Sequence, residues 1–253
     1  MKPRTKRRAQ AVSSKEAYQR KFADSDALCR YVADRMQTVF ISFSGGKDAI
    51  GSWIQMRRYF KTIIPFHLEM IPGVRFAEDS IRYYEDVFQT RIYRYPHPSF
   101  FRMLRNLVFQ PPERCALIES LELPKFTYDD IEYDLRRKLN LPDAFVGVGN
   151  RASDSMVRRT NIRKFGALNP NRLHFLPVFD WSTERLMPEI RTAKVRLSVE
   201  YEMFGRSFDG LTHLWLQGVQ TYFPEDYQRI LEWFPLAHLE FARRRIKPEG
   251  GAT

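Results

Sequence analysis

A glycine-rich segment, Ser44-Gly45-Gly46-Lys47-Asp48, carries the residue types best suited to chemistry on a phosphate. Two adjacent glycines let the backbone turn tightly, so that successive N–H groups point into one hollow that accepts an anion. Lys47 adds a mobile positive charge and Ser44 adds a hydroxyl group, whereas Asp48 is suited to capping a helix or holding a magnesium ion. The pattern predicts a pyrophosphate-binding loop, and an ordinary strand–turn–helix connection with a Gly-Gly turn is the alternative.

A second segment, 146–158, places two arginines close to a pair of glycines. The planar guanidinium groups of Arg151 and Arg158 suit a phosphate or sulfate group, which they can hold through parallel hydrogen bonds. The segment also fits the Gly-x-Gly-x-x-Ala dinucleotide fingerprint, but we reject that interpretation because no Asp or Glu lies near residue 168 to hold a ribose. The alternative is a solvated basic helix that includes Arg159, Arg163 and Lys164.

The elements around these segments indicate how a fold would position them. The segment 38–43 is β-branched and aromatic, as a buried strand is, and 49–60 repeats its apolar residues at helical spacing. The loop therefore joins a strand to a helix whose N-terminal dipole favours a bound anion. The alternation of elements predicts an α/β fold with a doubly wound parallel sheet. Further strands are expected at 62–70, 91–95, 144–148 and 173–178, and helices from Ser13 or Ser14 to about Arg20, from Asp24 or Ser25 to Met36, at 77–88, within 97–142, and at 182–194 and 225–234.

The ends of the chain differ in composition from its middle. Residues 1–13 are predicted to be a disordered basic arm, residues 14–205 the nucleotide-binding α/β domain, and residues 206–253 a helical C-terminal extension. The arm carries five cations without an acidic neighbour, and a second basic cluster lies at 243–247. A net charge of +11 serves solubility or favours a polyanionic partner, so we expect nucleic acid to bind through the arm.

Cysteine usage and hydropathy exclude several classes of protein. The two cysteines, Cys29 and Cys115, are too few for a disulfide scaffold or a four-cysteine zinc or iron–sulfur site, so no iron–sulfur cluster is expected. The five histidines lack metal-ligand spacing. No apolar run approaches the roughly 18–20 residues that span a bilayer, and the basic N-terminus lacks the apolar part of a secretory signal. We therefore expect a cytoplasmic protein without membrane contact.

The glycine-rich loop resembles the SGGxDS signature of the PP-loop adenine-nucleotide α-hydrolases, and 146–158 and 175–182 resemble segments of their phosphoadenosine-phosphosulfate (PAPS) reductase branch. The resemblance implies a Rossmann-like sheet that binds an adenine nucleotide at the carboxyl ends of its strands. It implies that ATP and Mg²⁺ are used, that Asp48 is the metal ligand, and that Lys47, Asp48 and Arg151 are catalytic. The nucleotide-binding residues that it implies are Ser42, Phe43, Ser44, Gly45, Gly46, Lys47, Asp48, Gly149, Arg151 and Arg158.

The resemblance also implies a reaction, since in ATP-using members a substrate oxygen attacks the α-phosphorus. We expect ATP pyrophosphatase chemistry that serves nucleic-acid modification or sulfur transfer. The sequence leaves open whether a protein partner takes part. The chain departs from the pattern at Ala49, where the signature has Ser or Thr, and at the inserted Asn150. A non-catalytic nucleotide sensor or nucleic-acid-binding partner is the alternative. A sulfonucleotide reductase is disfavoured because Cys115 is the last cysteine, and 223–235 resembles phage and mobile-element members instead.

Overall fold

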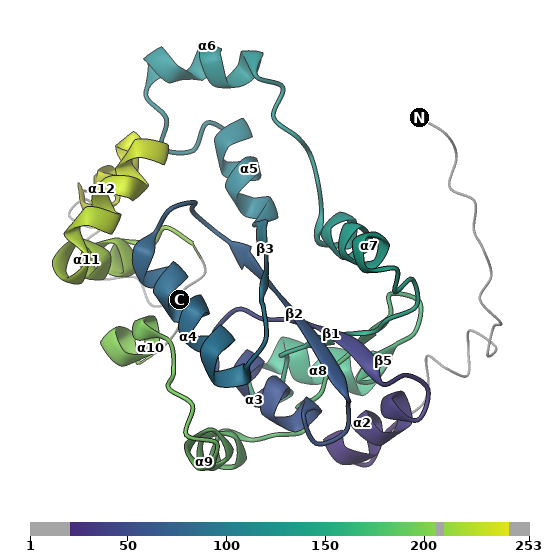
Figure 1. Ribbon diagram of the computed structural model, residues 1–253. Helices are drawn as coiled ribbons and strands as arrows, with labels where there is room; N and C mark the ends of the chain where they lie inside the picture. Colours follow the sequence, from purple (N-terminus) through teal and green to yellow (C-terminus); the bar gives the residue numbers. More distant parts are fainter. Residues whose placement is uncertain (1–20, 206–209, 243–253) are drawn as a thin grey trace, which may run out of the picture. The chain divides into compact units, whose positions relative to one another are not determined.

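The computed structural model describes residues 21–205 and 210–242 (Figure 1). The chain divides into two compact units. Unit 1 includes the described residues up to Phe43, together with Lys47–Ile64 and Asp143–Arg196, and unit 2 includes Ser44–Gly46, Pro65–Pro142 and the described residues from Leu197 onward. The basic arm at 1–13, the helix expected to reach Arg20 and the basic cluster at 243–247 lie outside the described residues.

Six strands form one sheet in the order β3-β2-β1-β4-β6-β5. Strand β1 pairs in parallel with β4, β4 with β6, and β2 with β3, whereas β5 runs antiparallel to β6. The order of the strands reverses between β1 and β4, which is the mark of a doubly wound sheet. The predicted α/β class with a mostly parallel sheet is therefore confirmed. The strands are β1 (Thr38–Ser42), β2 (Thr62–Glu69), β3 (Tyr93–Pro96), β4 (Val146–Val148), β5 (Leu168–Asn169) and β6 (His174–Phe175).

The helices of unit 1 pack around an apolar core that includes the buried Cys29. Asp24 caps the first of them by accepting the Ala27 N–H at 2.7 Å. The helix after the loop ends at Met56 instead of the expected Phe60, because the N–H groups of Arg58 and Tyr59 bond three residues back and close a tight turn. The helices are α2 (Ser25–Ala33), α3 (Lys47–Met56), α8 (Met156–Phe165) and α9 (Thr183–Thr192).

The helices of unit 2 share one core, to which residues 71–104 and 211–237 both contribute. A capping box starts α7, where the side chains of Thr127 and Asp130 each accept the other's backbone N–H. The sequence predicted no helix at the position of α10, whereas α11 lies in the segment 206–253, for which helical structure was predicted without bounds. The helices are α4 (Arg75–Phe88), α5 (Pro98–Arg105), α6 (Pro112–Ser120), α7 (Tyr128–Leu139), α10 (Val199–Phe204), α11 (His213–Tyr222), α12 (Pro224–Trp233) and the 3-10 helix η1 (Pro235–Leu239).

The first turn of α4 is capped from a distant part of unit 2. Its N-cap residue, Val74, has no side chain that could accept a hydrogen bond, and the N–H groups of Arg75 and Phe76 donate instead to Asp226 of α12, at 2.8 and 3.0 Å. Asp226 is only 4% exposed, so the negative charge faces the positive end of the helix dipole inside the protein. Helix α12 is thereby tied to α4.

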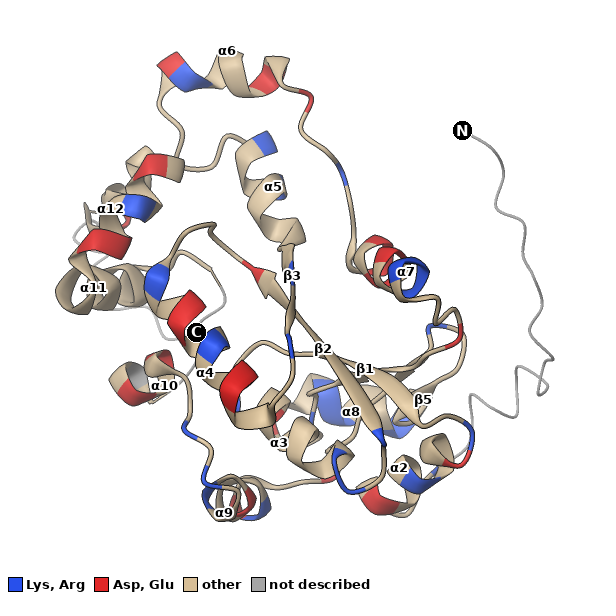
Figure 2. Cartoon of the chain, viewed as in Figure 1, with Lys and Arg blue, Asp and Glu red and all other residues tan. Residues whose placement is uncertain are grey.

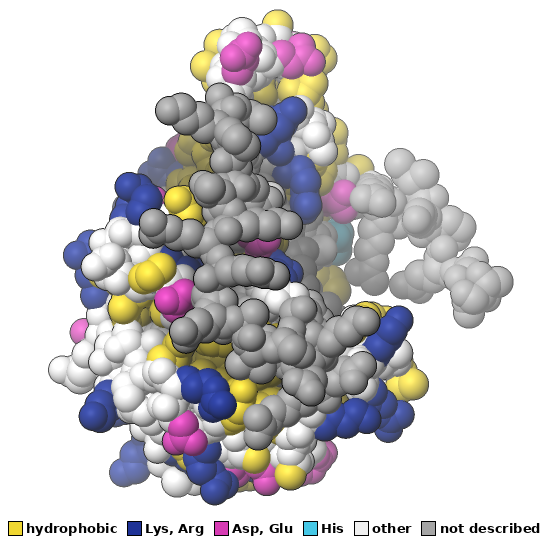
Figure 3. All heavy atoms as spheres, turned by 90° about the vertical axis from the view of Figure 1, so that its right-hand side faces the viewer, with side chains coloured by type: hydrophobic (Ala, Val, Ile, Leu, Met, Phe, Trp, Pro, Cys, Tyr) yellow, Lys and Arg dark blue, Asp and Glu magenta, His cyan; other side chains and the backbone are white. Residues whose placement is uncertain are grey.

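Charged side chains occur on the helices of both units (Figure 2). On the face drawn in Figure 3, Lys and Arg side chains gather in several places, in keeping with the net charge of +11. Among the described residues no helix is both long and apolar enough to cross a membrane.

Candidate functional site

The glycine-rich loop leaves the carboxyl end of β1 and leads into α3, as the sequence predicts. Ser42 is half-buried at the end of the strand, and the buried Phe43 packs edge-on against Trp53 of α3, with 5.4 Å between the ring centroids. Ser44 is exposed and accepts the N–H of Gly46 on its hydroxyl at 3.3 Å. The strand and the helix are thus anchored in the core of unit 1, and the loop begins with an exposed hydroxyl.

Gly45 has a backbone conformation that favours glycine, with φ +75°. The Tyr84 hydroxyl of α4, which is fully buried, donates to the Gly45 carbonyl at 3.4 Å. A Cβ added at Gly45 would lie 3.6 Å from the Tyr84 ring, which leaves ordinary contact distance, so backbone conformation alone requires glycine here. Tyr84 therefore fixes the loop within unit 2.

Lys47 and Asp48 form the first turn of α3. The Lys47 ammonium lies 3.3 Å from Asp48 Oδ2, and the two side chains are 21% and 17% exposed. An acidic side chain in the first turn is stabilised by the helix dipole. Both charged groups are therefore partly exposed to solvent, so that a ligand can reach them.

Arg151 is held inside unit 1, with a side chain only 2% exposed. Its Nε donates to Asp48 Oδ1 at 2.6 Å, and its Nη2 donates to Asp154 Oδ1 at 2.7 Å. Its Nη1 donates to the hydroxyl of Ser153 and to the carbonyl of Trp181, at 3.0 and 3.1 Å. Four of the five N–H groups of the guanidinium thus have protein acceptors. In this arrangement Arg151 ties the segment after β4 to the start of α3.

Gly149 lies where the end of β4 touches the start of α3. A Cβ at this position would stand 2.9 Å from the Ala49 nitrogen and 2.9 Å from the Asp48 carbonyl carbon, both of which are backbone atoms. Any side chain would push the two segments apart, because backbone cannot give way as the end of a side chain can. The buried Ala49, 3% exposed, belongs to the same contact.

Arg158, the second arginine predicted to bind phosphate, lies on α8 and is more accessible. Its side chain is 46% exposed and donates to Asp154 Oδ2 at 2.7 Å. Asp154 therefore accepts from both arginines, and it joins Arg158 to the group around Arg151. The structure brings Asp48, Arg151 and Arg158 into one connected set of charges in unit 1.

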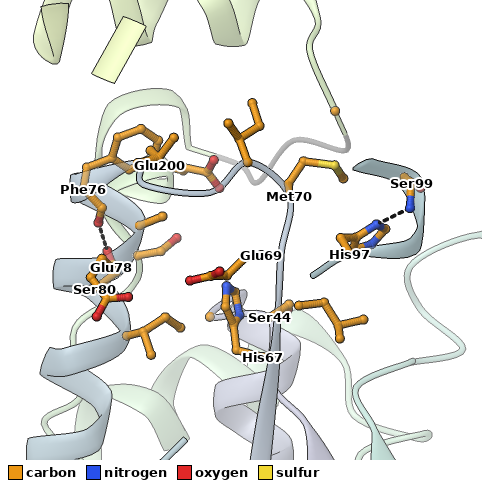
Figure 4. Close-up of a pocket in the computed structure, with 18 of the residues that line it drawn as sticks. Ser44, His67, Glu69, Met70, Phe76, Glu78, Ser80, His97, Ser99 and Glu200 are labelled. Atoms are coloured by element: carbon orange, nitrogen blue, oxygen red, sulfur yellow. Dashed lines mark hydrogen bonds between the residues drawn. The ribbon is translucent and has the colours of Figure 1, made fainter. Parts of the chain in front are cut away.

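Unit 2 contains a cavity of about 730 Å³ that begins at the loop (Figure 4). Ser44 and Gly45 form part of its wall, His67 and Glu69 point into it from β2, and Arg75–Glu78 contributes the first turn of α4. In a doubly wound sheet, ligands bind at the carboxyl ends of the strands, which is where this cavity lies. Its volume falls in the range typical of small-molecule sites.

Glutamates give the cavity much of its polar character. The Glu78 carboxylate is held by Arg94, with Nε and Nη2 each 3.1 Å from its oxygens, and Glu200 accepts from Trp215 Nε1 at 2.6 Å. Burial, and then the nearby Glu78 carboxylate, raise the pKa of Glu69 above its ordinary value. Glu69 therefore holds its proton to a higher pH than a solvated glutamate does.

His97, at the N-terminus of α5, forms a hydrogen bond with Tyr128, and both residues line the cavity. The protonation of the His97 ring determines which of the two donates. Its Nδ1 accepts the N–H of Ser99 at 3.0 Å, so a neutral ring carries its proton on Nε2. That nitrogen lies 3.2 Å from the Tyr128 hydroxyl oxygen, to which it donates. The Tyr128 proton is then directed away from His97 and is available to a ligand in the cavity that both residues line.

We did not predict these cavity residues from the sequence, in which the five histidines lack metal-ligand spacing. The signal that could have found them is their position, because His67 and Glu69 end β2 and His97 directly follows β3. The carboxyl ends of parallel strands meet at one edge of a sheet. Among the described residues no three His, Cys, Asp or Glu side chains are arranged to hold a metal ion.

The third sequence segment has a mainly structural position. Trp181 is fully buried, and Asp180 accepts both the N–H and the hydroxyl of Ser25. Ser182, not Asp180, caps α9 by accepting the Arg185 N–H at 3.3 Å. The segment therefore links α2 and α9 within unit 1.

No protein-family model and no curated protein matches the chain. Similar solved structures include a PAPS reductase from Candida auris in a phosphate complex, with 13% identity over 74% of this chain and 87% of that one, at a TM-score of 0.45. An NH3-dependent NAD synthetase from Campylobacter jejuni is similar over 90% and 96% of the chains, with 10% identity and a TM-score of 0.45. An NMN synthetase from Francisella tularensis is similar over 96% and 100%, with 13% identity and a TM-score of 0.32.

All three structures belong to the PP-loop adenine-nucleotide α-hydrolase superfamily, which the loop motif also resembles. At this low identity and TM-score the likenesses carry no argument about activity.

Proposed function

We propose that the chain binds ATP together with Mg²⁺, with the phosphates on the Ser44–Asp48 loop and the nucleoside in the cavity of unit 2. The observation that carries the proposal is that Ser44 and Gly45 of the loop are also part of the cavity wall. A phosphate chain held by the loop would thus continue into a space large enough for a nucleoside. Tyr128 and Glu69 offer a hydrogen-bond donor and a carboxyl group to that nucleoside.

The residues at the start of α3 suit the charged part of such a ligand. Lys47 presents an ammonium group of the kind that pairs with phosphate oxygens. Mg²⁺ bound together with a nucleotide needs only one or two protein carboxylates, and Asp48, 17% exposed, offers one. Bound Mg²⁺ would neutralise phosphate charge, while Arg151 keeps the Asp48 carboxylate in place through its 2.6 Å bond. A metal site with one carboxylate therefore fits the residues present.

The reaction that we propose is transfer of the adenylyl group to a substrate oxygen. That oxygen forms a bond to the α-phosphorus, the bond from the α-phosphorus to the bridging oxygen of the β-phosphate breaks, and pyrophosphate leaves. A sulfur or nitrogen nucleophile then forms a bond to the activated carbon, the bond from that carbon to the adenylated oxygen breaks, and AMP leaves, in nucleic-acid modification or sulfur transfer. The net charge of +11 supports nucleic acid as the partner, bound in part by the arm at 1–13.

The proposal is tested by Lys47→Ala and calorimetric titration with ATP. Losing one charge-assisted hydrogen bond should weaken binding by about 1.5–3 kcal/mol, or roughly 10- to 150-fold. Lys61→Ala, which removes an exposed lysine in the turn before β2, is the matched control and should bind ATP as the unchanged protein does. Equal ATP affinity in all three proteins would end the proposal.

A nucleotide sensor without catalysis is the second candidate, and Ala49 favours it. The residue lacks the hydroxyl that the PP-loop signature provides at this position, and it is 3% exposed. The two candidates differ in turnover, so AMP and pyrophosphate release should be measured with and without DNA or RNA. ATP binding without turnover, in both the unchanged protein and Ala49→Ser, would favour the sensor.

A further inference from the structure

Helix α8 has an unusual composition for a helix of a folded unit. None of its ten residues is buried, and only Ile162 is half-buried against unit 1. It carries four basic residues and no acidic one. Because a surface helix normally buries an apolar stripe, a helix with this pattern presents most of its circumference to solvent or to a partner. The basic residues are Arg158, Arg159, Arg163 and Lys164.

The four cations of α8 fall into two pairs with different surroundings. Arg158 donates to Asp154, and Arg159 donates through Nε to the Ala152 carbonyl at 3.4 Å, so both are bound to the segment before the helix. Arg163 and Lys164 are exposed, and within the described part of unit 1 neither takes part in an ion pair. The second pair therefore keeps its charge available for an external anion.

Exposed apolar side chains also lie on α8. Met156 and Val157 are 69% and 70% exposed, and Phe165 is 47% exposed. The Lys164 ammonium lies 5.0 Å from the centroid of the Phe165 ring, so a cation and an aromatic face are presented together. Proteins that bind single-stranded nucleic acid combine these two features, because phosphates pair with the cations while unpaired bases stack on aromatic rings.

The N-terminal segment of the chain joins unit 1 at the same place. Lys21 and Phe22 line a shallow pocket of about 440 Å³ together with Ile162 and Arg163 of α8. Within the described residues, Lys21 therefore adds a further positive charge beside Arg163 of α8.

We propose that α8 is a contact surface for single-stranded nucleic acid, which pairs its phosphates with Arg163 and Lys164 and stacks a base on Phe165. The proposal deepens the proposed function by placing nucleic-acid contact on a folded helix, and it rests on that function only for the choice of partner. Charge complementarity selects a polyanion, and the exposed ring selects unpaired bases over duplex DNA or a lipid surface.

The test uses the full chain and fluorescent single-stranded DNA and RNA of about 20 nucleotides, with anisotropy titrations at several salt concentrations. The double variant Arg163→Gln/Lys164→Gln should bind about tenfold more weakly. The slope of log affinity against log salt should become shallower by about 1.4, since each phosphate contact on a single strand contributes about 0.7. Phe165→Ala should weaken binding by about 5- to 150-fold with the salt slope unchanged, because stacking releases no counterions.

The matched control is Arg57→Gln/Lys61→Gln, which removes two exposed charges elsewhere on unit 1. It should leave both affinity and slope nearly unchanged, and all variants should bind ATP as before, which separates this proposal from the nucleotide site. Equal losses in the control, or an unchanged affinity in the α8 variants, would overturn the proposal. Binding of the full chain to phosphatidylserine vesicles without binding to either oligonucleotide would overturn it in favour of a lipid surface.

Discussion

Replacing Arg151 with methionine separates an internal role for this residue from a role in binding phosphate. The substitution keeps much of the side-chain volume but leaves the carboxylates of Asp48 and Asp154 without their guanidinium, to which they are bonded at 2.6 and 2.7 Å. Breaking a buried ion pair by removing one partner costs about 3–5 kcal/mol. Because the two carboxylates remain 17% and 11% exposed, water partly compensates, and we expect about 3 kcal/mol.

The assay is thermal unfolding of the nucleotide-free protein. For a chain of this size, about 3 kcal/mol lowers Tm by about 6–12 °C. Arg158→Met is the matched control, because Arg158 bonds to the same Asp154 but its side chain is 46% exposed, where an ion pair contributes about 0–1 kcal/mol. If Arg151→Met has the same Tm as the control while its ATP affinity falls, then Arg151 binds the phosphates of the ligand. Its role as an internal partner of Asp48 and Asp154 is then wrong.

Three further predictions concern other parts of the two units. Gly149→Ala should lower the free energy of unfolding by about 1–3 kcal/mol and weaken ATP binding. Gly147→Ala should lower the free energy of unfolding less, because its Cβ would meet the flexible end of a methionine side chain instead of backbone. Chemical denaturation measures the stability of both variants. Tyr128→Phe should weaken ATP binding by about 0.5–1.5 kcal/mol, and Tyr133→Phe, which lies exposed on the same helix, should not; a reversed order in calorimetry would remove Tyr128 from the site. Burial raises the pKa of the Cys29 thiol, so native protein should show one reactive thiol and denatured protein two, in a titration with a thiol reagent.

The loop and its flanking elements were predictable because their signals are local. Thr38–Ser42 is rich in apolar and β-branched residues and Gly45 needs a positive φ, so a few consecutive residues determine a strand and a turn. The helix that follows was predicted from residue 49 and begins two residues earlier, at Lys47. The capping box at Thr127 is likewise determined by a few consecutive residues. The α/β order follows from these local patterns through the rules for parallel sheets.

The roles of individual site residues were harder to predict because they depend on contacts distant in sequence. Arg151 has the character of a phosphate ligand in the sequence, yet its guanidinium is bonded to Asp48, 103 residues away. Gly149 fits a nucleotide-binding pattern, yet it also allows the close contact with the start of α3. Tyr128 became a candidate only through its hydrogen bond to His97, 31 residues earlier. No periodicity or spacing in the sequence reports such pairs.

The cap that Asp226 provides for α4 has a consequence for the order in which the chain is completed on the ribosome. The acceptor of the Phe76 N–H is synthesised 150 residues after Phe76 itself, which at typical elongation rates is roughly 8–30 s later. An isolated helix forms and frays in about a microsecond, so α4 spends that interval with its first turn uncapped. The first turn of α4 is also a wall of the cavity. A nascent chain that has not yet reached α12 therefore lacks a finished wall of this cavity, and under the proposed function a bound nucleotide cannot guide the folding of the earlier half of the chain.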